Sequence, residues 1–340
     1  MEGDDSTMVK IKDIAKKCNT STATVSKALH NSPELSRQTI DRIQKVAKEM
    51  GYVPNFYAMA LKSNKTYNIG IVYYDATFYG GLRHEYFSGI LDSIKNTAEA
   101  RGYCITFLSR TSKMSYLELA KFRNMDGVIV VTEEFNNPKV IELVNSDIPT
   151  VTIDYIFSSS TAIMSDNIQG EKELVDYVTS MGHRKIAFIH GEMTDVTKKR
   201  LSGFNQALIS HNLSLPKEYL IEGRFHDPKS SGKATQQLLR LDSRPTCIFY
   251  PDDISLFGGI TALTEAGLKI PYDISVVGYD GASISRVYRP EITTYMQNYD
   301  ELGKLAADCL INQIEDPLFP IVPHFVTGKV QYGQTVKKIN

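Results

Sequence analysis

The sequence predicts an α/β protein with a small all-helical head followed by a larger body of parallel sheets in two lobes. Its 340 residues, 42% of them hydrophobic, are enough for about two or three separate cores. Helical periodicity fills residues 10–51, whereas short apolar runs alternate with amphipathic segments from Asn68 onward. The charges divide at the same place, because residues 8–65 carry 11 Lys and Arg against 4 Asp and Glu, and residues 66–340 carry 27 against 32.

The first helix of the head is predicted over residues 11–18, where apolar side chains recur at helical spacing. Asn19 follows where a tight turn needs a left-handed residue, and Ser21 can cap a second helix. A third helix should start at Ser36 and end at Gly51. The residues expected to face one small core are Ile11, Ile14, Ala15, Cys18, Val25, Ala28, Leu29, Ile40, Ile43, Val46, Ala47 and Met50.

This order of helices predicts a helix-turn-helix with a supporting third helix. The second helix has an unusually polar outer face, whose small side chains and one cation could approach base edges and phosphates. The alternative is a three-helix domain that packs on a partner protein, and the basic charge favours DNA. The side chains expected to point outward are Thr22, Ala23, Ser26, Lys27 and His30.

The head resembles the DNA-binding domain of the LacI–GalR family of transcriptional regulators, through "DIA", "STATVS", "SRQT", "GYVPN" and "AMAL". The segments "MGHRKIAFIHG", "RLSGF" and "DISVVGYDG" extend the resemblance from Lys10 to near Gln334. It implies a helix-turn-helix domain over 8–53, a hinge helix and linker over 54–66, and an effector-binding and dimerisation domain over 67–335. That last domain is expected to resemble a periplasmic binding protein.

The resemblance also implies individual roles in DNA binding. Thr22 and Ala23 would read bases, and Lys27 stands where the family often has arginine, which grips guanine with two donors rather than one. Leu61 would be an apolar wedge in the minor groove, although the same segment also reads as a flexible linker. The expected DNA-binding residues are Lys12, Ser21, Thr22, Ala23, Thr24, Ser26, Lys27, His30, Ser36, Thr39, Tyr52, Asn55, Ala58 and Leu61.

Seven apolar runs predict the buried strands of two parallel sheets, with crossings between the lobes near 162–164 and 293–296. Aspartates follow four of these strands, at Asp75, Asp154, Asp252 and Asp280. Ligands bind at the carboxyl ends of parallel strands, so these carboxylates should meet in one crevice and bind hydroxyls. An aspartate at this place is also often just a helix cap.

The resemblance adds Arg200 as the residue that grips a ligand oxygen and Phe225 as the aromatic that stacks on a sugar face. Asp252-Asp253 replaces the family's Asn-Asp, and this change favours a hydroxyl-rich or cationic ligand over a phosphorylated one. Asp166 and Asn167 are expected at the rim of the cleft. The expected effector-binding residues are Tyr74, Asp75, Phe78, Asp154, Arg200, Phe225, Asp252, Asp280 and Gln297.

We therefore expect a ligand-responsive transcriptional repressor that acts in the cytoplasm as a homodimer. It should bind a pseudo-palindromic DNA operator and sense a small polyhydroxylated molecule, which the resemblance implies is a sugar. Catalytic motifs, metal-ligand spacing and apolar spans of membrane length are missing, so no enzyme activity, cofactor, metal or membrane association is expected. The alternative is a sugar-binding or sugar-converting protein with an accessory helical head. The four cysteines, Cys18, Cys104, Cys247 and Cys309, are expected to be core residues in a reducing compartment.

Overall fold

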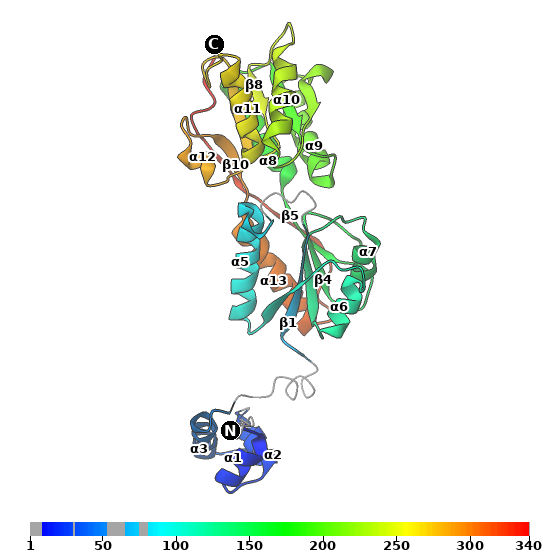
Figure 1. The fold of residues 1–340 in the computed structure, drawn as a ribbon, viewed down its shortest axis with the longest axis vertical. Coiled ribbons are helices and arrows are strands. Elements are labelled where there is room, and N and C mark those ends of the chain that lie inside the picture. The colour runs from blue at the N-terminus through cyan, green and yellow to red at the C-terminus, as the bar shows by residue number, and fades with distance from the viewer. Residues whose placement is uncertain (1–8, 30, 53–64, 75–80, 340) are drawn as a thin grey trace, which may run out of the picture. The chain divides into compact units, whose positions relative to one another are not determined.

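The computed structural model describes residues 9–29, 31–52, 65–74 and 81–339. The chain divides into two compact units, residues 1–66 and 67–340, which we call the head and the body (Figure 1). Each unit is described by itself below.

The head contains the three predicted helices, α1 (Ile11–Lys17), α2 (Thr22–Leu29) and α3 (Arg37–Glu49). Asn19 has φ 49° and makes the left-handed turn between α1 and α2. Ser21 Oγ accepts a hydrogen bond from Thr24 N at 3.1 Å, and Ser36 Oγ caps α3 by accepting one from Thr39 N at 3.3 Å. The predicted turn and both predicted caps are confirmed.

One small core holds the three helices of the head together. Its buried members come from all three helices, and Leu29, Ile40, Val46 and Met50 pack partly buried against them. The predicted core is therefore confirmed in its positions, with its edge more exposed than its centre. The buried members are Ile14, Ala15, Cys18, Val25, Ala28, Ile43 and Ala47.

The first lobe of the body is built on a six-stranded sheet in the order β11-β5-β4-β3-β1-β2, with every neighbouring pair parallel. Its strands are β1 (Asn68–Tyr73), β2 (Cys104–Leu108), β3 (Gly127–Thr132), β4 (Thr150–Ile153), β5 (Thr161–Ser165) and β11 (Pro323–Val326). Its helices are η1 (Gly81–Arg83), α5 (Glu85–Ala100), α6 (Tyr116–Phe122), α7 (Pro138–Val144) and α13 (Tyr299–Glu315).

The second lobe repeats this plan with the order β12-β10-β9-β8-β6-β7, in which only the β10–β12 pair is antiparallel. Its strands are β6 (Ile186–His190), β7 (Leu220–Glu222), β8 (Cys247–Phe249), β9 (Ser275–Asp280), β10 (Thr293–Met296) and β12 (Lys329–Gln331). Its helices are α8 (Asn167–Ser180), α9 (Asp195–Ser210), η2 (Lys217–Tyr219), α10 (Pro228–Leu239), α11 (Asp253–Glu265) and α12 (Ile284–Val287).

Each lobe is a three-layer sandwich with one hydrophobic core on each face of its sheet (Figure 1). In the first lobe, α5 and α13 cover one face and α6 and α7 cover the other. In the second lobe, α8 and α9 cover one face and α10 and α11 cover the other. Because both faces are covered, the central strands β3, β4 and β6 are buried almost throughout, as their apolar sequences predict.

The chain crosses between the lobes three times, after β5, after β10 and after β11. The two segments predicted as crossings are regular strands of the two sheets, and the crossings follow them. β7, β11 and β12 were not predicted, because they are only three or four residues long and lie at sheet edges with partly exposed side chains. The predicted parallel α/β class and its two lobes are confirmed.

One cysteine departs from the prediction. Cys18, Cys247 and Cys309 are buried, but Cys104 is exposed. The expectation of a core residue was wrong there, because Cys104 begins β2, which is the edge strand of the first sheet and is not covered on both faces.

Candidate functional site

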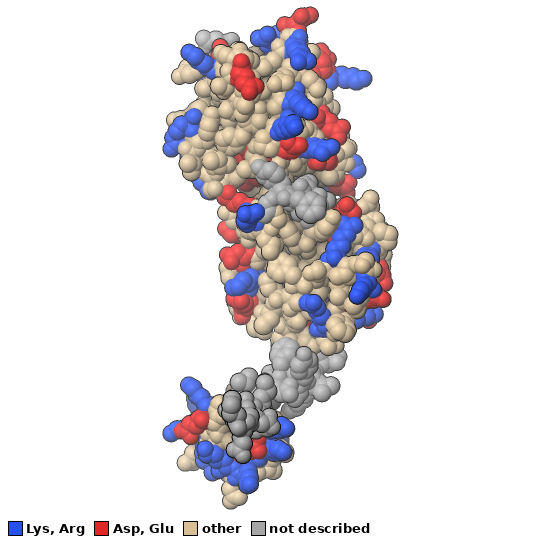
Figure 2. Space-filling model, in the orientation of Figure 1, with Lys and Arg blue, Asp and Glu red and all other residues tan. Residues whose placement is uncertain are grey.

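The surface of the head is rich in cations. Every Lys and Arg side chain in the described part of residues 9–52 is exposed, and Figure 2 shows cations gathered over the head, while the body carries both signs of charge. Exposed cations on a small helical domain provide the electrostatic attraction that duplex phosphates require. These residues are Lys10, Lys12, Lys16, Lys17, Lys27, Arg37, Arg42, Lys45 and Lys48.

The outer face of α2 presents three of the predicted base-reading residues. Thr22, Ala23 and Lys27 are exposed, and Ser26 is half-buried. Lys27 Nζ forms an ion pair with Glu34 in the segment between α2 and α3. The hydrogen bond and the positive charge of Lys27 lower the pKa of Glu34, and the Glu34 carboxylate competes with any external anion for that lysine.

The remaining DNA-binding candidates fall into three groups. Serine and threonine hydroxyls pair at the start of each helix, Ser21 with Thr24 at 2.9 Å and Ser36 with Thr39 at 2.8 Å, next to the positive ends of the helices. Tyr52 packs against the head core. His30, Asn55, Ala58 and Leu61 lie outside the described residues.

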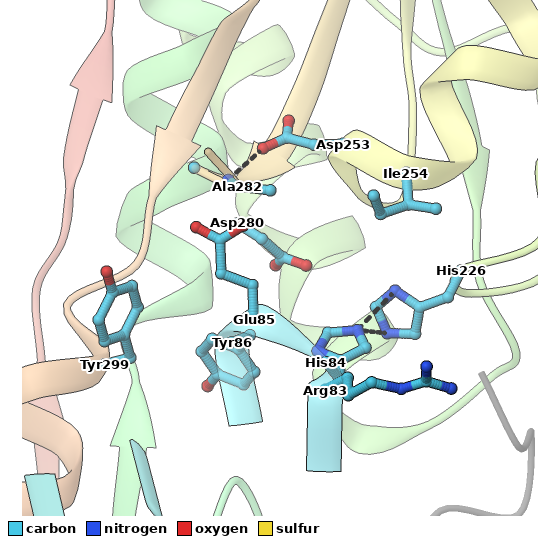
Figure 3. Close-up of a pocket in the computed structure, with 11 residues that line it drawn as sticks. Arg83, His84, Glu85, Tyr86, His226, Asp253, Ile254, Asp280, Ala282 and Tyr299 are labelled. Carbon is cyan, nitrogen blue, oxygen red and sulfur yellow. Dashed lines mark hydrogen bonds between the residues drawn. The ribbon is translucent and has the colours of Figure 1, made fainter. Parts of the chain in front are cut away.

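The body contains a cavity of about 210 Å³ between its two lobes. Figure 3 shows carboxylates from both lobes on one side of it and imidazole and guanidinium groups on the other. The first lobe contributes Arg83, His84, Glu85, Tyr86 and Tyr299, and the second lobe contributes His226, Asp253, Ile254, Asp280, Gly281 and Ala282. The carboxyl end of β9 therefore faces the N-terminal turn of α5 across the cavity.

Asp280 is the described effector candidate that lines the cavity directly. It ends β9 with φ 98°, a left-handed backbone that turns its side chain out of the strand. Its Oδ1 accepts a hydrogen bond from Gln297 Nε2 at 2.7 Å and lies 3.6 Å from Arg200 Nη2. No described residue donates a hydrogen bond to Oδ2, which leaves this oxygen available to a ligand hydroxyl.

Arg200 lies behind Asp280 and is buried, with 4% of its surface exposed. Its Nε donates to Asn167 Oδ1 at 2.8 Å and its Nη1 donates to Pro251 O at 2.7 Å. The guanidinium carbon lies 3.5 Å from the centre of the Tyr279 ring, a cation–π contact. Arg200 is thus in contact with Asn167, Pro251 and Tyr279 of the second lobe, and it reaches the cavity through Asp280.

Three other candidates stand one contact away from the cavity. Asp154 has φ 60° and accepts a hydrogen bond from the cavity-lining Tyr86 at 2.9 Å, while burial raises its pKa. Asp252 accepts from His226 N at 2.8 Å. Phe225 precedes His226, and its ring packs where a side chain at Gly191 would otherwise stand.

Asp252 is also a helix cap. Its Oδ1 accepts from Ser255 N and its Oδ2 from Ser255 Oγ, both at 2.7 Å, so it holds the start of α11. Asp166 likewise caps α8 by accepting from Gln169 N at 3.1 Å. Capping, the simpler interpretation of a strand-end aspartate, therefore engages both oxygens of Asp252, and Oδ2 also accepts from His226 N.

The structure does not bring Tyr74 to the cavity. Its ring lies beneath the Arg110 guanidinium, with 4.3 Å between the guanidinium carbon and the ring centre. Asp75 and Phe78, expected in the same loop, lie outside the described residues.

Two contacts from the first turn of α5 cross the cavity to the second lobe. His84 Nε2 lies 3.1 Å from both ring nitrogens of His226, and the ring centres are 4.1 Å apart. The Glu85 carboxylate accepts from both Ser283 N and Ser283 Oγ. These contacts join the two lobes across the cavity.

Sequence reasoning missed these crossing residues and also Asp253. Asp253 Oδ2 accepts from Ala282 N at 2.7 Å, and burial raises the pKa of this carboxyl well above its ordinary value. Its Oδ1 packs against Gly278, where a Cβ on residue 278 would lie only 2.1 Å from this oxygen. In the sequence, the Asp252-Asp253 pair pointed to Asp253 and "RFHDP" pointed to His226. The partners of His84 and Glu85 had no such signal, because they depend on how the two lobes come together.

Within the described ranges, no group of three or more His, Cys, Asp or Glu side chains is placed to hold a metal ion. No described helix is long and apolar enough to cross a bilayer.

Two family models match the chain. The model for bacterial regulatory proteins of the lacI family matches residues 10–55, and the model for a periplasmic binding protein-like domain matches residues 175–336. The probable HTH-type transcriptional repressor ExuR of Bacillus subtilis (strain 168) is 31% identical over 314 residues, which cover 91% of this chain and 93% of that protein.

Solved structures share the fold. The lac repressor dimer bound to operator and the anti-inducer ONPF aligns with a TM-score of 0.80 and 22% identity, over 97% of this chain and 99% of that one. A LacI family transcriptional regulator from Enterococcus faecium with bound ribose aligns with a TM-score of 0.68 and 25% identity, over 80% of this chain and all of that one. The relatives named here are transcriptional regulators and not enzymes.

Proposed function

Because this chain belongs to the lacI family of bacterial regulatory proteins, we propose that it is a cytoplasmic, dimeric repressor whose DNA binding is controlled by a small polyhydroxylated metabolite. The head would bind a pseudo-palindromic operator, and the cavity of the body would bind the metabolite, most simply a sugar. The observation that carries this proposal is the position of the Asp280 carboxylate, which lines a cavity between the two lobes and is backed by the buried Arg200.

The cavity chemistry supports a ligand with several hydroxyl groups. Asp280 offers a carboxylate oxygen that only accepts, and sugar hydroxyls are donors that suit it. The ring of Phe225 lies 5.7 Å from the Arg200 guanidinium and offers an apolar surface near the same charge. The ribose complex of the Enterococcus faecium regulator shows that a protein with this fold holds a sugar.

The head supports DNA reading by α2. Thr22 and Ala23 would contact base edges in the major groove, and Lys27 would contact guanine or phosphate. Ser21 and Ser36, at the starts of α2 and α3, would position the head on phosphates together with Thr24, Thr39 and Lys12. Asn55, Ala58 and Leu61 would form the hinge that reaches the minor groove.

The ligand would control DNA binding by changing how the two lobes close. His84 and Glu85 join the lobes in the present arrangement, and a ligand that binds this arrangement more tightly than an open one shifts the population toward it. Such a shift is transmitted to DNA affinity as a coupling of about 1–3 kcal/mol.

The experiment has two parts. Fluorescence anisotropy of the full chain with random-sequence duplexes at graded salt should show attachment that weakens as salt rises, and selection from the same library should yield a palindromic site. A thermal-shift panel of sugars, polyols and nucleosides should show stabilisation by a hydroxyl-rich compound. Salt-insensitive DNA binding, or stabilisation by nucleosides alone, would contradict the corresponding half of the proposal.

A further inference from the structure

Glu171 is a buried carboxyl that the effector site as described so far does not use. It lies on α8 with 1% of its surface exposed, and its Oε2 is buried and accepts no hydrogen bond from any described residue. A buried acid without such a bond is costly when ionised. The structure must therefore keep it uncharged or give it a nearby cation.

The nearby cation is Arg200. Glu171 follows Asn167 by one helical turn on α8, and Asn167 Oδ1 is the acceptor for Arg200 Nε. Gly170, between them, packs against the Tyr279 hydroxyl, and the same Tyr279 ring carries the Arg200 guanidinium. Glu171 therefore belongs to the group of side chains that surrounds Arg200.

Other titratable groups lie on the elements that pack against α8. They are Asp195, Lys198, Lys199 and Arg200 of α9, Tyr279 and Asp280 of β9, Tyr295 of β10 and Lys329 of β12. Among these, Arg200 is the group that acts on the Glu171 carboxyl. Burial raises the pKa of Glu171 to about 8, and Arg200 opposes that rise.

We propose that Glu171 is a positioning residue for Arg200. The proton on the Glu171 carboxyl decides how the Arg200 guanidinium is shared between α8 and the cavity. With Glu171 uncharged, the counter-charge of Arg200 is Asp280, which among the described carboxylates lies within 4 Å of it, at 3.6 Å. When Glu171 loses its proton, a second counter-charge draws the guanidinium from Asp280 toward α8. This inference rests on the proposed role of Arg200 and Asp280 in effector binding.

The consequence is a proton-linked effector site. A ligand oxygen that accepts a hydrogen bond from Arg200 competes with ionised Glu171 but not with the protonated acid. Affinity for such a ligand would therefore fall as pH rises through the Glu171 transition, and binding would take up a proton above it.

The direct test needs no effector. In the deuterated full chain, the Nε–H signal of Arg200 is assigned by comparison with Arg200→Lys and followed by NMR from about pH 6.5 to about pH 9.5, a span that brackets the expected transition. We expect the signal to shift with a midpoint near 8, the pKa of Glu171. In Glu171→Gln the shift should vanish, and in Glu171→Asp a titration should return.

The matched control is Glu173→Gln, which removes a half-buried carboxylate from the same helix, where it accepts from Gln169 Nε2 at 3.0 Å. That variant should keep the titration of the wild type. An Arg200 signal that does not move with pH, or that moves equally in Glu171→Gln, would overturn the inference. Because no effector is present, these outcomes are independent of whether the panel of sugars yields a ligand.

Discussion

Glu85, at the start of α5 in the first lobe, accepts hydrogen bonds from the backbone amide of Ser283 at 2.8 and 2.9 Å and from its hydroxyl at 2.9 Å in the second lobe. Replacing it by Gln removes the charge and should favour lobe opening. Hydrogen bonds to charged groups contribute about 1.5–3 kcal/mol, and the exposure of Ser283 places the expected loss near or below the lower figure.

Lobe opening in Glu85→Gln is measured as the interlobe distance by double electron–electron resonance. The control is Glu99→Gln, because Glu99 lies near the other end of α5 and pairs only with Lys95 at the surface. Equal distance distributions for wild type and Glu85→Gln would show that this contact does not hold the lobes together.

Asp280→Asn should abolish the effector response while DNA binding remains. In the variant an NH₂ group, which donates, replaces one of the two carboxylate oxygens. That oxygen is either Oδ1, which accepts from Gln297 and faces Arg200, or Oδ2. Loss of a charged hydrogen bond predicts effector binding weaker by roughly 10- to 150-fold. Titration calorimetry with the sugar found in the panel checks this, beside Asp242→Asn at an exposed position of the same lobe. An unchanged dissociation constant would remove Asp280 from the site.

Glu34→Gln should strengthen DNA binding, because it releases Lys27 from its ion pair. We expect the slope of log affinity against log salt to steepen by up to about one unit, as for one additional phosphate contact. Glu49→Gln adds the same net charge at an exposed position of α3 and serves as the control in anisotropy titrations. If both variants change the slope equally, the effect is one of net charge and not of Lys27.

Thr22→Val should change the preferred operator sequence, whereas Ser36→Ala should weaken binding to all sequences alike. Thr22 is exposed at the start of α2, but Ser36 caps α3, and loss of such a cap costs about 0.5–2 kcal/mol of stability. Sequencing of the duplexes selected from a random library measures both. Identical sequence profiles for wild type and Thr22→Val would argue against base reading by this residue.

Glu171→Gln should stabilise the body in alkaline solution. The pKa of Glu171 in the folded protein, about 8, lies above the ordinary glutamate value of 4.5, so the wild type loses stability as pH rises between these values. The advantage of the variant should grow through that window, by on the order of 1.4 kcal/mol for each pKa unit, and then level off. Urea unfolding at several pH values measures it, and a constant difference between variant and wild type would contradict the assignment.

The helices of the head could be predicted from sequence because their signals are local. Asn19 at the left-handed turn and the caps Ser21 and Ser36 act within a few residues of their own positions. The central strands were predictable for a similar reason, since burial on both faces imposes a continuous apolar run. β7 and β12 lack such a run because they lie at sheet edges.

The site was only partly predictable, because its contacts depend on tertiary arrangement. Asp280 was expected in the cavity and lines it, but the same strand-end pattern at Asp252 reflects a helix cap. The contacts of His84 and Glu85 join segments more than a hundred residues apart along the chain. No spacing rule links such positions, and only the closed lobes bring them together.

The threefold passage of the chain between the lobes has a consequence during synthesis. The sheet of the first lobe is completed by β11, and α13 covers one of its faces, yet both are made after nearly all of the second lobe. At about 5–20 residues per second, the ribosome needs roughly 8–30 s to pass from the end of β5 to the end of α13. For that time α5 alone covers this apolar face of the sheet, so we expect the nascent protein to depend on chaperones that shield such surfaces.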